Sequence, residues 1–148
     1  TPLLFHLLAH RAHITDLTVM LQKEVIDRIV ARPGSEHYGR LGVMLFPWFE
    51  MKKLFDVGPG AFRPPPKVWS SMARLNVLPG PRFAVPPAYA QVVAQAFSQR
   101  RKTLRNALRG LLGPAAFDAA GIDPGARPET LSPQQFAALA ELAGNPPA

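Results

Sequence analysis

A proline-rich break near the middle of the chain constrains the fold more than any other sequence feature. Leu78-Pro79-Gly80-Pro81 is followed after a short interval by Pro86-Pro87. Each proline fixes its own backbone φ angle and restricts the residue before it, so a helix or a central strand cannot continue through this segment. Apolar residues follow strand and helix patterns before the break and helix patterns alone after it. We therefore predict two units, residues 1–80 and residues 81–148.

The first unit alternates helices and strands, which is typical of an α/β fold. The apolar run at residues 18–21 predicts a buried, parallel strand. Pro47 is expected to kink or shorten the helix after Tyr38. The predicted elements are helices at residues 2–8, 23–32 and 38–49, and strands at residues 18–21, 51–57 and 68–77. On the last strand, one face holds Trp69, Ala73, Leu75 and Val77.

The second unit is predicted to be helical throughout. An apolar stripe predicts one long helix over residues 88–112, and a short helix follows near residues 115–120. The last helix has a clear start, because Ser132 is an N-cap residue and Gln135 completes a capping box with it. Gly144 is the expected end of this helix.

Charge is distributed unevenly along the chain, which has a formal net charge of +7. Residues 81–113 contain six basic and no acidic residues, whereas residues 114–148 contain one basic and four acidic residues. On one continuous helix, Arg101, Arg105 and Arg109 would form a basic ridge, because they are four residues apart. Arginine matches the geometry of phosphate oxygens, so the ridge favours phosphate binding over an incidental charged surface.

Other chemistry is less well supported by the residues present. The chain has no cysteine, which excludes disulfides, thiolate metal sites and a cysteine nucleophile. His6, His10 and His13 lack well-placed companion ligands, so we expect no metal site. No apolar run is long enough for a membrane span, and we expect no contact with a membrane.

A stiff loop around Phe62 is the strongest local feature of the first unit. Gly60-Ala61 precede the aromatic residue, and Arg63 and a run of three prolines, Pro64 to Pro66, follow it. Such a loop can present an aromatic face reproducibly, as stacking on an unpaired base requires. Alternatively, Phe62 plugs the core below an ordinary hairpin connection, because most aromatic side chains serve packing. The residues alone leave both interpretations open.

Four segments, taken in order, resemble the ribosomal RNA adenine dimethyltransferase family over essentially the whole chain. They are Leu21-Gln22-Lys23-Glu24-Val25, Tyr38-Gly39-Arg40-Leu41, the segment from Val57 to Val68 around Phe62, and Arg100-Arg101-Lys102-Thr103-Leu104-Arg105-Asn106. The resemblance implies the C-terminal part of a Rossmann-like class I methyltransferase domain, followed by a small all-α rRNA-binding domain. Pro47-Trp48 departs from the family pattern.

The resemblance also implies an activity and a set of contacts. The family transfers methyl groups from S-adenosylmethionine to N6 of two adjacent adenosines near the 3′ end of small-subunit rRNA, within the precursor of the 30S subunit. Phe62 would contact the target adenine, and Arg63, Pro64, Pro66 and Lys67 would shape and charge its loop. The residues expected to contact rRNA are Arg100, Arg101, Lys102 and Arg105, with Arg109 on the same ridge. We further expect a monomer that acts in the cytoplasm.

The family motifs for cofactor and target amine are not found among residues 1–148. A glycine-rich cofactor loop, an acidic ribose-binding residue and an Asn-Leu-Pro-Tyr motif would all precede Thr1. We therefore expect the chain to be a fragment that is inactive alone, with no complete set of catalytic residues. The alternative is a non-catalytic assembly or transcription factor of the same fold, which binds rRNA or DNA.

Overall fold

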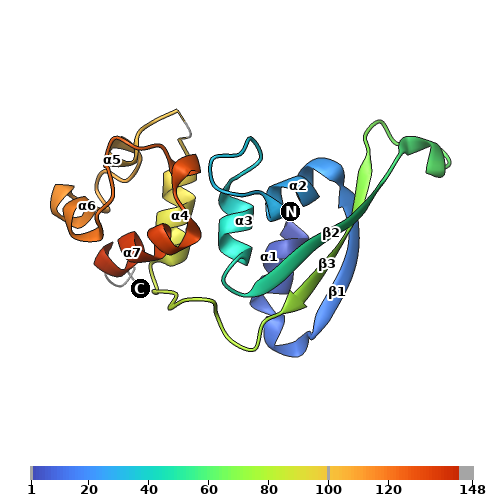
Figure 1. Ribbon diagram of the computed structural model, residues 1–148, viewed down its shortest axis with the longest axis horizontal. Coiled ribbons are helices and arrows are strands. Elements are labelled where there is room, and N and C mark those ends of the chain that lie inside the picture. The colour runs from blue at the N-terminus through green and yellow to red at the C-terminus, as the bar shows by residue number, and fades with distance from the viewer. Residues whose placement is uncertain (1, 100, 144–148) are drawn as a thin grey trace.

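The structure, a computed structural model, describes residues 2–99 and 101–143 (Figure 1). A three-stranded sheet with its helices occupies one side of the molecule, and a group of helices occupies the other. The sheet side consists of α1 (Pro2–Ala9), β1 (Asp16–Gln22), α2 (Lys23–Val30), α3 (Arg40–Leu45), β2 (Phe49–Val57) and β3 (Ser70–Val77). The other side consists of α4 (Tyr89–Phe97), α5 (Leu104–Ala107), α6 (Pro114–Ala120) and α7 (Pro133–Ala143). Short 3-10 helices are η1 (Arg11–His13), η2 (Pro59–Ala61) and η3 (Pro128–Thr130).

The central strand, β3, is antiparallel to both β1 and β2. The prediction of a buried, parallel strand at residues 18–21 is therefore wrong. Exposure alternates along β1: Val19 packs toward the helices, whereas Met20 is 47% exposed on the opposite face. An antiparallel sheet that is covered on one face produces this alternation, which the apolar run in the sequence conceals.

A first hydrophobic core, the sheet-side core, lies between the sheet and α1, α2 and α3. Its buried members are Leu4, Leu8, Ile26, Ile29, Leu41, Leu45, Phe49, Ala73 and Leu75. Helix α3 is shortened before Pro47, as predicted, and approaches α2 very closely. A Cβ atom added at Gly42 would lie only 2.8 Å from the backbone carbonyl oxygen of Arg28. Glycine is therefore required where the two helices meet.

The single long helix predicted over residues 88–112 is wrong, because α4 and α5 are separate helices. The amide N–H groups of Leu104 and Arg105 donate to the carbonyl oxygens of Ala126 and Pro124, at 2.8 and 2.9 Å. A continuous helix would satisfy these donors internally. A distant loop satisfies them here, so the chain can turn before α5 without leaving buried N–H groups unpaired.

The last helix begins as predicted. The Ser132 side-chain oxygen accepts a hydrogen bond from the Gln135 amide at 3.2 Å, and the Gln135 side chain accepts one from the Ser132 amide at 2.9 Å. This reciprocal pair is a capping box, and it confirms the predicted start of α7. The predicted stop at Gly144 lies outside the described residues.

A second hydrophobic core, the helix-side core, lies among α4 to α7. Its largest buried side chains include Tyr38, Phe117, Phe136, Leu104, Leu108 and Leu139. Helix α3 contributes to both cores, because Leu41 and Leu45 belong to the sheet-side core and Val43 belongs to the helix-side core. The two cores are therefore joined through a helix of the first unit.

Two buried tyrosines form hydrogen bonds across the boundary between the cores. The Tyr38 hydroxyl donates to the carbonyl oxygen of Leu131 at 2.6 Å, and the Tyr89 hydroxyl donates to that of Val43 at 2.7 Å. Burial raises the pKa of both phenols above the ordinary value, so both remain protonated donors. No helix in the described part of the chain is long and apolar enough to cross a membrane.

Candidate nucleic-acid interface

The loop that carries Phe62 connects β2 to β3 and projects beyond the helices that cover the sheet (Figure 1). The Ala61 and Phe62 amides each donate to a loop carbonyl at 3.2 Å, and Phe62 itself is extended (φ −121°, ψ 154°). Its side chain is only partly buried and belongs to neither hydrophobic core. Arg63, Pro64, Pro66 and Lys67 are all exposed. The structure therefore does not place Phe62 as a core plug, and its ring is accessible.

Trp69 supports the base of this loop. The alternation in the sequence places Trp69 on the same face as the buried Ala73 and Leu75, but β3 begins at Ser70, and Trp69 is 53% exposed. A Cβ atom at Gly58 would lie 3.3 Å from the Trp69 ring, so the indole packs directly against the glycine backbone. The Trp69 carbonyl accepts a hydrogen bond from the Lys23 amide at 2.9 Å. The loop is thus connected at its base to the start of α2.

A chain of alternating charges lies on the same part of the sheet. Asp27 forms ion pairs with Lys23 at 2.7 Å and with Lys53 at 3.1 Å. Lys53 also pairs with Asp56 at 2.8 Å, and the buried Ser71 hydroxyl donates to Asp56 at 2.5 Å. We call these five residues the lysine–aspartate network. It joins α2 to the hairpin that carries Phe62.

The pKa values of this network follow from its contacts. Partial burial alone would raise the pKa of Asp27, but hydrogen bonds and charge from Lys23 and Lys53 outweigh it, and the pKa is lowered. The hydrogen bond from Lys53, aided by Ser71, lowers the pKa of Asp56. The hydrogen bond to Asp56 correspondingly raises the pKa of Lys53. Asp27, Lys53 and Asp56 are therefore charged at neutral pH, which suits a structural role better than proton transfer.

The predicted basic ridge is not a helical ridge. Arg101 and Lys102 lie in the turn before α5, Arg105 lies within α5, and Arg109 lies in the turn after it. All four side chains are exposed. Arg100 lies outside the described residues. The prediction of one straight row of arginines is wrong because the helix breaks before Leu104, but the charges remain on the surface.

No acidic side chain pairs with these four basic residues within the described parts of the chain. Arg109 donates to the side-chain oxygen of Asn106 at 2.8 Å, which fixes its position without neutralising it. Arg127 donates to the carbonyl oxygen of Arg101 at 2.6 Å and adds a further exposed cation. Arg127 is the one basic residue in the acidic stretch 114–148, so no pattern in the sequence predicts that it joins this surface. We call Arg101, Lys102, Arg105, Arg109 and Arg127 the basic segment.

The structure does not bring the basic segment and the Phe62 loop together. In Figure 1 the η2 turn beside Phe62 lies at one end of the long axis, and α5 lies near the other end. Any ligand that contacts both must therefore span most of the molecule. An extended polymer meets this requirement, and a small molecule does not.

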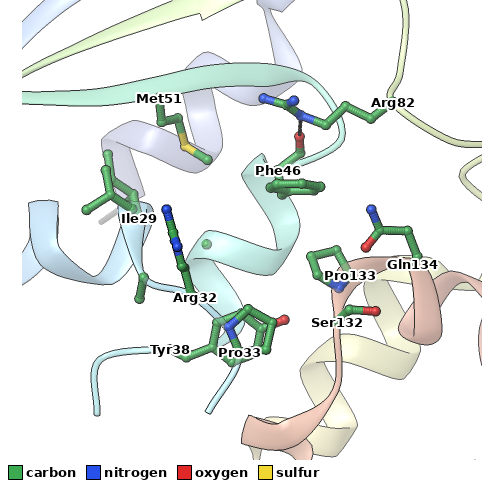
Figure 2. A pocket seen from close by; sticks show the side chains of 13 residues that line it. Ile29, Arg32, Pro33, Tyr38, Phe46, Met51, Arg82, Ser132, Pro133 and Gln134 are labelled. Atoms are coloured by element: carbon green, nitrogen blue, oxygen red, sulfur yellow. Dashed lines mark hydrogen bonds between the residues drawn. The ribbon is translucent and has the colours of Figure 1, made fainter. Parts of the chain in front are cut away.

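A cavity of about 370 Å³ lies at the boundary between the cores, and none of the predicted site residues lines it (Figure 2). The Arg32 side chain points into it from the end of α2. Arg82 donates to the carbonyl oxygens of Phe46 at 2.8 Å and of Phe49 at 3.0 Å, and its guanidinium lies 4.6 Å from the centre of the Phe46 ring. These contacts engage Arg82 in holding the proline-rich connection against the start of β2.

The residues of this chain do not by themselves fit S-adenosylmethionine. A nucleoside cofactor of this kind needs a carboxylate for its ribose hydroxyls. Three cavities formed by the described residues, of about 370, 270 and 280 Å³, have arginines but no acidic residue in their walls. Among the described residues, no group of three histidine, cysteine or acidic side chains is arranged to hold a metal ion. The His6 and His10 rings lie against each other at an angle of 38°, with centres 4.4 Å apart.

A family model and full-length relatives both match this chain, and both concern methylation of ribosomal RNA. The family model described as ribosomal RNA adenine dimethylase matches residues 1–144. The chain is 57% identical over 141 residues to the ribosomal RNA small subunit methyltransferase A of Aromatoleum aromaticum, covering 94% of this chain and 53% of that protein. It is 48% identical over 143 residues to the protein of the same name from Hahella chejuensis, covering 95% and 52%. The chain thus spans about half the length of these relatives.

Two solved structures share the fold. A dimethyladenosine transferase from Plasmodium falciparum superposes with a TM-score of 0.80 at 23% identity, over 93% of this chain and 60% of that one. The 23S rRNA methyltransferase ErmE superposes with a TM-score of 0.59 at 29% identity, over 86% and 54%. The sheet with its helices is therefore an α/β methyltransferase-like fold. With a family model matched over residues 1–144 and relatives near 50% identity, this chain belongs to the ribosomal RNA adenine dimethylase family.

Proposed function

We propose that the protein to which this chain belongs is an S-adenosylmethionine-dependent rRNA adenine N6-dimethyltransferase. Its substrates would be two adjacent adenosines near the 3′ end of small-subunit rRNA in the precursor of the 30S subunit. The observation that carries the proposal for this chain is the basic segment. Its exposed cations have no acidic partners within the described residues, and phosphate groups are their natural ligands.

Under this proposal the two units have different roles. Residues 1–80 belong to the methyltransferase domain, and residues 81–148 form a helical rRNA-binding domain. The proline-rich connection supports this division, and so does the helix-side core, because most of its buried members follow that connection. The tyrosine bonds from Tyr38 and Tyr89 would then fix the RNA-binding surface relative to the domain that carries the Phe62 loop.

Phe62 would contact the target adenine. Enzymes that modify a base inside folded RNA must take it out of the stack, and an accessible aromatic ring can replace part of the lost stacking. The stiff loop gives Phe62 a defined position, so little conformational entropy is lost on binding. Arg63 and Lys67, which follow Phe62 in sequence and are exposed, would contact nearby phosphates.

RNA binding by the 148-residue chain tests the proposal. The probe is a fluorescent oligoribonucleotide with the sequence of the 3′-terminal stem-loop of small-subunit rRNA, titrated at several salt concentrations. Arg101→Ala with Arg105→Ala should weaken binding and lower the slope of log K against log salt by about 1.5, because each lost phosphate contact removes about 0.7–0.9. The control is Lys52→Ala with Arg74→Ala. These two exposed basic residues occupy opposite positions on the neighbouring strands β2 and β3, on the outer face of the sheet.

Three outcomes separate the possibilities. A selective loss of binding in the Arg101 and Arg105 variant supports the proposal, whereas equal effects of both double variants contradict a specific surface.

Methyl transfer is measured separately with labelled S-adenosylmethionine, and we expect none from this chain because the three cavities described above offer no carboxylate for the cofactor. If a longer protein that includes this chain also binds rRNA without methylating it, the non-catalytic alternative replaces the enzyme.

A further inference from the structure

A second cavity also lies at the boundary between the cores. This boundary groove, of about 270 Å³, is lined by Phe5 of α1, Arg28 of α2, His37 and Arg40 near the start of α3, and Phe97 of α4. Tyr38 lines it as well, so the groove combines three aromatic rings with two guanidinium groups and an imidazole. No acidic side chain lines it. Aromatic rings interleaved with cations are typical of surfaces that bind a nucleic-acid strand.

Arg40 is the best-placed ligand-binding group in the boundary groove. Its guanidinium lies 5.0 Å from the centre of the Phe5 ring, which orients the planar group. Within residues 2–99 and 101–143, its side chain has no hydrogen-bond or ion-pair partner, so its N–H donors are available. Arg28 is paired with Glu24 at 3.0 Å, but both side chains are about half exposed or more, and such pairs contribute little.

The boundary groove lies between the two surfaces already described. Along the upper edge of Figure 1, the turn before α5 is followed by the loop between α2 and α3, then by α2, and then by the tip of the β2–β3 hairpin. The groove is formed where this middle loop meets α2 and the end of α4. In this view, the direct path of an extended strand from the basic segment to the Phe62 loop therefore crosses the segments that line the groove.

Resting on the proposed function, we propose that the boundary groove binds a phosphodiester of the rRNA strand between the basic segment and the Phe62 loop. Arg40 would donate to the phosphate oxygens, Arg28 would add positive charge, and the partly exposed Phe97 would contact the adjoining sugar or base. The 370 Å³ cavity is the weaker candidate, because Arg82 is already engaged by backbone carbonyls and Arg32 acts there alone.

Substitution of Arg40 tests this inference in the 148-residue chain with the same labelled oligoribonucleotide. Arg40→Ala should weaken binding about tenfold, as expected for a lost charge-assisted contact, and should lower the salt slope by about 0.7–0.9. Arg40→Lys keeps the charge without the planar fork and should restore the slope but only part of the affinity. Arg32→Ala is the matched control, because it removes the same charge from the same part of the chain and faces the other cavity.

The outcomes distinguish this inference from the function on which it rests. If the Arg101 and Arg105 variant loses affinity while Arg40→Ala and Arg32→Ala bind as the parent chain does, the groove is wrong and the proposed function stands. If Arg40→Ala and Arg32→Ala weaken binding equally, only general charge is involved, and the groove is again wrong. If no variant changes binding, both the groove and the proposed function are wrong. Thermal unfolding of each variant verifies that the fold is retained.

Discussion

The phenol oxygen of Tyr89 donates a 2.7 Å hydrogen bond to the backbone carbonyl oxygen of Val43, which lies on the other side of the proline-rich connection. Tyr38 forms the complementary bond in the opposite direction, to the carbonyl oxygen of Leu131. Both tyrosines are 2% exposed. The boundary between the two cores is therefore a packed and hydrogen-bonded interface, and single substitutions can test each of its polar groups.

Tyr89→Phe should destabilise the protein by about 1–3 kcal/mol, because it leaves the Val43 carbonyl buried without this donor. The ring and its packing are kept, so the change reports on the hydroxyl alone. The measurement is the free energy of unfolding from urea titration followed by circular dichroism. A loss below about 0.5 kcal/mol would show that water replaces the phenol at this carbonyl.

Gly42→Ala should destabilise the protein by about 1–3 kcal/mol, because the added methyl group would lie 2.8 Å from the carbonyl oxygen of Arg28 and push α3 away from α2. Gly39→Ala is the matched control: its Cβ would meet no atom within 4 Å, and its backbone is extended. Urea unfolding of the two variants side by side provides the comparison. Equal stability would contradict the close approach of the two helices.

Ser132→Ala should lower the free energy of unfolding by about 1 kcal/mol, because it removes the oxygen that caps the first turn of α7. Ser132→Asp should retain most of the stability, since aspartate accepts the same hydrogen bond and suits the positive end of a helix. Chemical unfolding of the three proteins measures both effects. Similar destabilisation by alanine and aspartate would indicate that the hydroxyl, and not capping, is what matters.

The lysine–aspartate network should make stability depend on pH in the acidic range. The folded-state pKa of Asp27 is below its ordinary value of 3.8, so its contribution is fully present above about pH 4–5 and is lost as pH falls through the folded pKa. Asp27→Asn should therefore be less stable than the parent at pH 7, and the difference should vanish in acid. Thermal unfolding between pH 2 and 7 measures it. A difference that is constant with pH would exclude the ionised carboxylate as its source.

Phe62→Ala should leave the free energy of unfolding nearly unchanged, because Phe62 belongs to neither core. If the proposed function is correct, the variant should bind the rRNA oligonucleotide about tenfold more weakly, within the range for one lost base–aromatic contact. Phe55→Ala is the control, since it removes another exposed phenylalanine from the same hairpin. A large loss of stability in Phe62→Ala would instead indicate a packing role for the ring.

The sequence predicted local structure well where one signal dominates. The capping box at Ser132, the shortening of α3 before Pro47 and the inward face of Ala73 and Leu75 on β3 all follow from residue chemistry over a few positions. The α/β character and the family also follow from the sequence, because short motifs in a fixed order are specific in combination.

The features that the sequence did not predict depend on contacts between residues that are distant in sequence. The long helix breaks because carbonyls near Pro124 satisfy the first amides of α5, and no helical periodicity contains that information. The same break converts a predicted ridge into a basic segment that Arg127 joins from a distant loop. The sequence does not predict the boundary groove either, because Phe5, Arg40 and Phe97 are distant in sequence and meet only in the folded chain.

Helix α3 has only six residues, yet it supplies Leu41 and Leu45 to one core and Val43 to the other. If one core unfolds, α3 loses part of its packing, and the other core then loses the support of this helix. We therefore expect heat to melt both halves in one cooperative transition, although the chain has two cores and a proline-rich connection. Despite the proline-rich connection, the two halves should not unfold independently, and a destabilising substitution in one half should also lower the stability of the other.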